Sequence, residues 1–250
     1  MNFKKTTFKL RQLFAASAGL LILSASCASP EAYIVTPIVE EGEHEIDIKY
    51  GSTKTRTGEK VAALSIGYGV AVNSRWFTEL YAKYQSSNGE RSFDAFAWEN
   101  RFLLTEQGKY WLDVGALIEI ERPKDRTEGY EVTYGLLLQK EQDRMQYNLN
   151  LMLQRHYRSP EFQQTNLMYQ AQAKYRYSQA FEPGVQAMGN LGKWDSWSGG
   201  NNTQHSIGPA IFGKISVGTK RKISYNAAIL RGTTLSTPKT TFRLQTEFEF

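Results

Sequence analysis

The sequence predicts a closed, antiparallel, up-and-down transmembrane β-barrel of about 12 strands, and three observations support this. Apolar and polar residues alternate with period two from residue 43 to the end of the chain. Long and short connections follow one another between the alternating stretches. The last stretch ends on an aromatic residue. Because no backbone group stays unpaired in hydrocarbon, a sheet with one face on lipid must close on itself.

Residues 1–28 have the three parts of a secretory signal peptide. Four basic residues and no acid precede the apolar stretch 13–23, and small residues follow it up to a predicted cleavage site after Ala28. The apolar stretch is about half of the ~20 residues that a membrane-spanning helix needs, which disfavours an uncleaved anchor. The alternative is lipidation of Cys27, but Ser24 stands where a lipobox prefers a large aliphatic residue.

The composition changes once this leader is removed. The 250 residues carry a net charge of +5, and four of the bases lie in the leader, so the mature chain has a net charge of +1. That balance removes the charge argument for a nucleic-acid partner. The single cysteine also leaves, which excludes a disulfide framework and a thiolate zinc site. With 41% hydrophobic and 22% charged residues, the chain is too apolar to be disordered.

Each predicted strand carries one apolar and one polar face. In the first strand Ile46 and Ile48 alternate with Asp47, and the same pattern continues to the C-terminus. The predicted strands are 46–50, 62–72, 76–84, 96–104, 110–120, 132–138, 147–153, 167–177, 185–187, 207–217, 223–229 and 242–250. Tilted strands of about ten residues span the hydrocarbon core. Only alternate residues then need to be apolar, which is compatible with a mean hydropathy of −0.48.

The connections alternate in length along the chain. Long polar loops are predicted at 52–60, 85–92, 122–128, 155–165, 192–205 and 232–239, and short turns at 73–74, 105–109, 141–144, 178–183 and 218–220. Outer-membrane barrels place short turns at the periplasmic rim and long loops outside, with both termini in the periplasm. Residues 29–42 are therefore predicted as a periplasmic N-terminal segment before a barrel of residues 43–250, or as a plug if they enter the lumen.

The end of the last strand resembles the signal that the barrel-assembly machinery of the bacterial outer membrane reads. Apolar residues stand in phase with the terminal phenylalanine, and the predicted signal consists of Phe242, Leu244, Phe248 and Phe250. Tyrosine and tryptophan near many strand ends agree with aromatic girdles at the two membrane interfaces, although core aromatics of a soluble protein would look the same.

The polar face of each strand would line the lumen, and this face is rich in charge. The candidate selectivity residues are the acids Glu79, Glu99, Asp113, Glu119 and Glu131 and the bases Lys83, Arg101, Lys174, Arg176, Lys214 and Arg243. Acids concentrate on the third to sixth predicted strands and bases on the eighth to twelfth, with Lys83 and Arg101 as exceptions. One hypothesis is a pore with a transverse field between opposed walls. The alternative is that these side chains pair and fill the lumen as a static polar core.

Three functions are considered: a passive channel for small solutes, which is favoured, a structural or interaction barrel with a blocked lumen, and a lipid-acting barrel enzyme. The enzyme is disfavoured because His205 and Ser206 are neighbours that point to opposite faces of a strand, and His156 is interpreted as a rim residue. No catalytic residue, metal site or cofactor is predicted. Outer-membrane lipids and lipopolysaccharide are the expected partners, with basic residues of the first loop and the tryptophans of the 192–205 loop as candidate contacts.

Three stretches carry a resemblance to a known family, at residues 99–111, 181–186 and 207–210. From residue 33 to residue 250, the chain resembles small proteobacterial outer-membrane barrel proteins that are grouped with barrels linked to the MetA pathway of phenol degradation. This resemblance carries no catalytic motif. It implies an outer-membrane barrel that passively conducts small or aromatic solutes.

Overall fold

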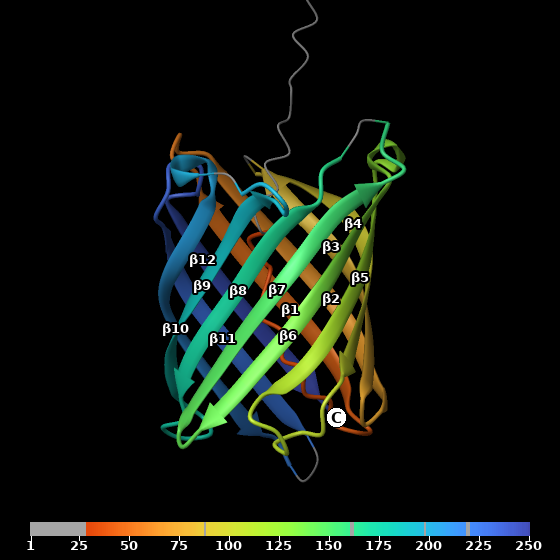
Figure 1. Cartoon of the computed structure of the whole chain (residues 1–250), viewed down its shortest axis with the longest axis vertical. Coiled ribbons are helices and arrows are strands. Elements are labelled where there is room, and N and C mark those ends of the chain that lie inside the picture. The colour runs from red at the N-terminus through yellow and green to blue at the C-terminus, as the bar shows by residue number, and fades with distance from the viewer. Residues whose placement is uncertain (1–28, 88, 161–162, 198, 219–220) are drawn as a thin grey trace, which may run out of the picture.

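The computed structural model describes residues 29–250 except 88, 161–162, 198 and 219–220. In this part of the chain twelve strands form a closed antiparallel barrel, in which each strand pairs with its neighbours in sequence (Figure 1). The first strand pairs with the last and closes the sheet, so no edge remains. This confirms the predicted fold. The predicted signal peptide, residues 1–28, lies outside the described residues.

The strands match the predicted ones in order. The first six are β1 (His44–Lys54), β2 (Lys60–Asn73), β3 (Trp76–Ser87), β4 (Glu90–Leu103), β5 (Asp113–Pro123) and β6 (Tyr130–Gln142). The second six are β7 (Met145–Tyr157), β8 (Asn166–Tyr175), β9 (Glu182–Lys193), β10 (Gln204–Ser216), β11 (Lys222–Gly232) and β12 (Thr240–Glu249). Two short 3-10 helices, η1 (Arg126–Glu128) and η2 (Gly200–Asn202), lie in connections.

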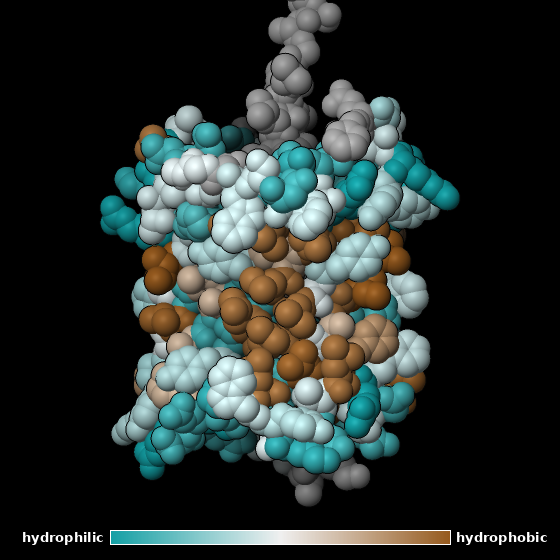
Figure 2. Space-filling view, viewed as in Figure 1, coloured by the Kyte–Doolittle hydropathy of each residue, from teal (hydrophilic) through white to brown (hydrophobic). Residues whose placement is uncertain are grey.

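The period-two pattern separates an outer apolar face from an inner polar face. On β1 the side chain of Ile48 is 42% exposed on the outside, whereas its neighbour Asp47 is 0% exposed inside the barrel. The register places apolar residues of neighbouring strands next to each other, and Ile48, for example, lies opposite Ile66 of β2. Figure 2 shows the result on one face of the barrel as a band of apolar side chains across the middle, with paler and hydrophilic residues above and below it, and exposed apolar side chains on the other strands continue this belt. Such a belt is the surface that a hydrocarbon layer covers.

The two ends of the barrel are named here by their connections. The loop rim carries the β1–β2, β3–β4, β5–β6, β7–β8, β9–β10 and β11–β12 connections, and the turn rim carries the others together with the C-terminus. Two predicted lengths were wrong. Strands β3 and β4 extend through most of the predicted loop 85–92. Residues 104–112 form a longer connection than the predicted turn 105–109, held by hydrogen bonds from Gly108 N to Asp113 Oδ1 and from Val114 N to Thr105 Oγ1.

Residues 29–43 run through the lumen from the loop rim to the turn rim, and we call them the inner segment (Figure 1). Near the loop rim this segment passes so close to β1 that a Cβ atom on Gly51 would lie 2.1 Å from the carbonyl carbon of Pro30. At the turn rim Ala71 N donates a hydrogen bond of 2.8 Å to Glu43 O. In this structure residues 29–42 therefore have the position of the plug alternative.

Apolar contacts explain why the inner segment stays inside. It presents three buried aliphatic side chains, and each packs against inward-facing apolar residues of a different part of the wall. The three clusters are Ile34 with Met188, Ala210, Phe212, Ala228 and Leu230; Val35 with Leu117 and Leu137; and Val39 with Phe77 and Leu103. Burying three such side chains contributes roughly 5–9 kcal/mol as an upper bound. Asn150 adds a hydrogen bond of 3.0 Å from its Nδ2 to Val35 O.

Candidate functional site: the lumen beside the inner segment

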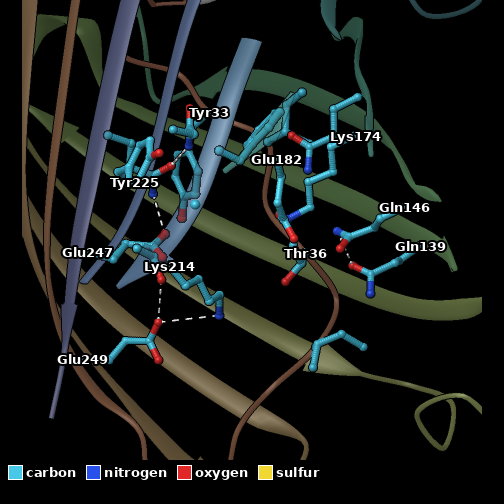
Figure 3. A pocket seen from close by; sticks show the side chains of 18 of the residues that line it. Tyr33, Thr36, Gln139, Gln146, Lys174, Glu182, Lys214, Tyr225, Glu247 and Glu249 are labelled. Atoms are coloured by element: carbon cyan, nitrogen blue, oxygen red, sulfur yellow. Dashed lines mark hydrogen bonds and ion pairs between the residues drawn. The ribbon is translucent and has the colours of Figure 1, made fainter. Parts of the chain in front are cut away.

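A polar cavity of about 540 Å³ lies between the inner segment and strands β6 to β12, and Glu45 of β1 and Arg101 of β4 also line it (Figure 3). Tyr33 and Thr36 of the segment form one side, and amide and charged side chains of the strands form the other. The cavity opens at the turn rim, where the lining side chains of Arg176 and Lys214 are 41% and 45% exposed. Its volume lies within the range of small-molecule sites.

The cationic side chains of this cavity are each held by a nearby carboxylate. Lys174 Nζ lies 2.5 Å from Glu182 Oε2 on the next strand. Arg176 Nη2 lies 2.5 Å from Glu141 Oε1, and it also donates a hydrogen bond of 2.8 Å to Gln146 Oε1. At the turn rim Lys214 Nζ lies 3.7 Å from Glu249 Oε1. Three of the four bases predicted for one wall, Lys174, Arg176 and Lys214, therefore each have a carboxylate partner close by.

A second group of charges fills the lumen against β1 to β4. Lys49 Nζ lies 2.9 Å from Asp47 Oδ2 and stands 3.6 Å from the ring centre of Tyr33 of the inner segment. Arg101 lies 3.4 Å from Glu99 and 3.6 Å from Glu45. These side chains are buried, and this side of the lumen is therefore a packed ionic core.

The predicted acid Glu79 belongs to the same core. It accepts a hydrogen bond from the Tyr81 hydroxyl, which itself accepts one from Lys49. A side chain replacing the hydrogen of Gly67 would meet both Glu79 and Tyr81, with Cβ 2.3 Å from the Glu79 Oε1 atom. The small residue at this position therefore makes room for the core.

A third group lies toward the loop rim. Lys83 Nζ bridges Glu119 at 3.0 Å and Glu121 at 2.5 Å. Glu131 Oε2 lies 2.9 Å from His156 Nε2, and Glu131 also accepts a hydrogen bond of 2.6 Å from Gln154. His156 is thus the partner of a carboxylate on the neighbouring strand. His205 Nδ1 lies 3.0 Å from the hydroxyl of Tyr169.

A chain of amide side chains, which was not among the predicted site residues, crosses the wall opposite the ionic core. Asn148 donates to Gln139 at 2.9 Å and accepts from Gln172 at 3.1 Å. Gln186 donates to Gln172 at 3.3 Å, and Arg243 Nη1 donates to Gln186 Oε1 at 3.0 Å. The signal that could have revealed this chain is the run of Gln and Asn on the polar face of three successive strands.

The other predicted residues have varied positions. Asp113 is not among the residues that line the cavity, and its side chain accepts a hydrogen bond from Gly108 N in the connection between β4 and β5. Arg243 is buried and forms no ion pair with any described residue. The acids Glu45, Glu121, Glu182 and Glu249 join the lumen charges and were not among the predicted selectivity residues. On the last strand, Phe242 and Leu244 lie exposed on the outer surface, and Phe250 stacks on His44 with ring centres 6.0 Å apart.

In the part of the chain that the structure describes, no group of three or more His, Cys, Asp or Glu side chains is arranged to hold a metal ion. Among the same residues, no helix has the length and apolar character that crossing a membrane requires.

Comparison with known proteins places this barrel among porin-type folds. No protein-family model matches the chain, and no curated protein matches it in sequence. The structure is similar to the NanC porin, with a TM-score of 0.56 and 7% identity over 83% of this chain and 100% of that chain. It is similar to the KdgM porin in complex with disordered oligogalacturonate, with a TM-score of 0.56 and 10% identity over 82% of this chain and 99% of that chain.

A third solved structure shows the same likeness. It is the COG4313 outer membrane channel from Pseudomonas putida F1, with a TM-score of 0.57 and 11% identity over 89% of this chain and 98% of that chain. At these identities the likeness shows the fold alone. The chain therefore has the fold of the porin-type outer-membrane β-barrels, with an inner segment in its lumen.

Proposed function

We propose that this protein is a passive channel for small solutes in the bacterial outer membrane. The observation that carries the proposal is the pairing of an outer apolar belt with a polar cavity inside the same closed sheet. Solutes would pass between the inner segment and the amide-bearing strands β6 to β9, because charged side chains pack the opposite side. The solutes are small because the segment takes part of the lumen.

The proposal includes a cleaved signal peptide, insertion by the barrel-assembly machinery, and lipopolysaccharide around the loop rim. Of the basic residues in the first loop, Arg56 already donates hydrogen bonds of 3.1 Å and 2.6 Å to the carbonyl oxygens of Thr237 and Thr234. Lys54 and Lys60 at the adjoining strand ends remain the candidate contacts for lipid phosphates. The exposed rings of Trp194 and Trp197 are candidate contacts for headgroups and sugars.

The family resemblance extends the proposal to aromatic solutes. Three stretches of sequence support it, and one of them includes Glu99 and Arg101, which form the ionic core described above. Nothing in the cavity selects a phenol over another small polar molecule, so this finer proposal depends on the sequence resemblance alone. Uptake of phenol into proteoliposomes, compared with uptake of a sugar of similar mass, tests it.

Conductance tests the channel itself. Purified protein is first checked for slower migration on a gel after boiling, which reports a folded barrel, and is then reconstituted in a planar bilayer. Discrete current steps are expected. The inner segment favours a second candidate, a barrel whose lumen is blocked. That barrel would show no steps as the full chain, and steps only after deletion of residues 30–40.

A further inference from the structure

The charged groups that line the cavity beside the inner segment do not balance. Among the residues that the structure describes, seven carboxylates and four cationic side chains line it. Each of the four cations lies within 4.0 Å of a carboxylate: Lys174 with Glu182, Arg176 with Glu141, Lys214 with Glu249, and Arg101 with Glu45. The acids are therefore in excess after every local pair has been formed.

One further base lies at the edge of the cavity. Lys222 Nζ lies 2.7 Å from Glu40 Oε2 of the inner segment and 2.7 Å from Glu249 Oε2. It neutralises Glu40, and with Lys214 it compensates Glu249. Since Lys222 binds two carboxylates that are already counted, it has no further charge to offer the rest of the cavity.

Two carboxylates stay without a cation. Among the described residues, no lysine, arginine or histidine nitrogen lies within 4.0 Å of Glu43 or Glu247. Glu247 accepts only a hydrogen bond of 2.6 Å from the amide of Gln245. Both line the cavity, and Glu247 is seen at its wall near Glu249 and Lys214 in Figure 3. Glu43 lies where the inner segment joins β1, at the turn rim.

We infer that the passage selects small cations over anions, and that Glu43 and Glu247 determine this selectivity. The inference rests on the proposed channel function. At about 5 Å in a water-filled passage, one uncompensated carboxylate favours a monovalent cation by about fourfold, and salt weakens this effect. Screening at moderate ionic strength reduces this attraction to about twofold for each carboxylate, so two carboxylates near one path give a cation-to-anion permeability ratio of at least roughly 5.

Arg243, which forms no ion pair with any described residue, does not cancel this preference. Arg243 is 4% exposed and is not among the residues that line the cavity. It lies behind the amide chain, with its Nη1 atom donating to Gln186 and contacting the sulfur of Met188 at 3.3 Å. A solute in the cavity therefore meets the carboxylates directly and the guanidinium only through intervening side chains.

The reversal potential across a planar bilayer tests the inference. With a tenfold gradient of KCl, the wild-type channel is expected to show a cation preference of roughly fivefold. Glu43→Gln with Glu247→Gln should bring the ratio close to one while leaving the size of the current steps within about twofold. Glu106→Gln is the matched control, because Glu106 lies near the same rim, is exposed and pairs with Lys109 at 2.7 Å outside the cavity.

The possible outcomes are distinct. A wild-type channel that conducts with no preference, or that prefers anions, overturns the inference and leaves the channel intact. A cation preference that the double variant retains overturns the assignment to Glu43 and Glu247. If the double variant does not fold, as judged by migration before and after boiling, the single variant Glu247→Gln provides the same comparison. If no current steps are observed, the proposed channel function is overturned, and the inference about selectivity is overturned with it.

Discussion

Truncation of Leu137 measures how firmly the inner segment is held in the lumen. Leu137 is on the inner face of β6, is 0% exposed, and packs with Val35 of the segment and Leu117 of β5. If the lumen held only water, the Leu137 side chain would be exposed to solvent. Its burial therefore depends on the segment, and the Leu137→Ala variant should be destabilised only when the segment is present.

The magnitude follows from the groups removed. Leu137→Ala deletes carbon atoms worth about 2.4 kcal/mol at about 0.8 kcal/mol per methylene-sized group. The space left behind raises the expected loss in free energy of unfolding to about 2–5 kcal/mol. In a chain that lacks residues 30–40, the same substitution removes a side chain that already faces water, and the cost should be below about 1 kcal/mol. The expected coupling between the two changes is about 2 kcal/mol.

Equilibrium unfolding in urea, with the barrel refolded into lipid vesicles, provides the four free energies of this cycle. The 5 tryptophans of the chain supply the fluorescence signal. The outward-facing neighbour Leu136 is the matched control, because Leu136→Ala changes a lipid contact and should cost the same with and without residues 30–40. Equal costs for Leu137→Ala in the two backgrounds would refute the position of the segment.

Three other predictions use different properties of the lumen. A Ser29→Cys variant has no other cysteine in its mature chain if cleavage follows Ala28. Because the inner segment begins at the loop rim, this cysteine should react in intact cells with a membrane-impermeant maleimide. Reaction only after lysis would place the loop rim in the periplasm. Burial raises the pKa of Glu43, so this carboxyl becomes neutral at a higher pH than an ordinary glutamate does. As the pH is lowered, the cation preference should therefore begin to fall while the pH is still above the usual glutamate pKa. A reversal potential that stays constant down to a pH well below the usual glutamate pKa would contradict this prediction. Arg101→Met should lower the free energy of unfolding by about 3–5 kcal/mol because Glu45 and Glu99 lose their partner, whereas Arg243→Met should be neutral or stabilising. Unfolding in urea compares the two variants, and equal losses would show that ion pairing does not determine the loss of stability.

The fold could be predicted from the sequence because alternation is a local property. Whether Ile48 or Asp47 faces lipid follows from their own positions along one strand, and neighbouring strands repeat the pattern. The packing inside the lumen, in contrast, depends on contacts between residues that are far apart in sequence. Leu137 stands between Leu136 and Leu138, where an apolar inner residue looks like an exception to the pattern, and only the fold brings it to Val35, which is far away in sequence.

The charged site shows the same limit. Lys174 and Glu182 are paired across one hairpin, and the predicted turn between them already placed the two residues near each other. Lys83 reaches Glu119 and Glu121 across the intervening strand β4, which depends on the stagger of the strands and on side-chain length. The alternation along each strand predicts that these side chains point into the lumen, whereas the register between strands determines which acid lies close to which base.

The division of the lumen gives the proposed channel its physical logic. An uncompensated charge attracts a solute of opposite sign, and a passage lined throughout by such charges would hold that solute instead of conducting it. Here Lys49 of the ionic core is buried against Tyr33, and Gln139, Gln146 and Gln172 present neutral hydrogen-bonding groups to the cavity. The unpaired carboxylates lie toward the turn rim, where the cavity opens. Selection at the mouth and neutral contacts along the wall would allow a cation to enter and also to leave.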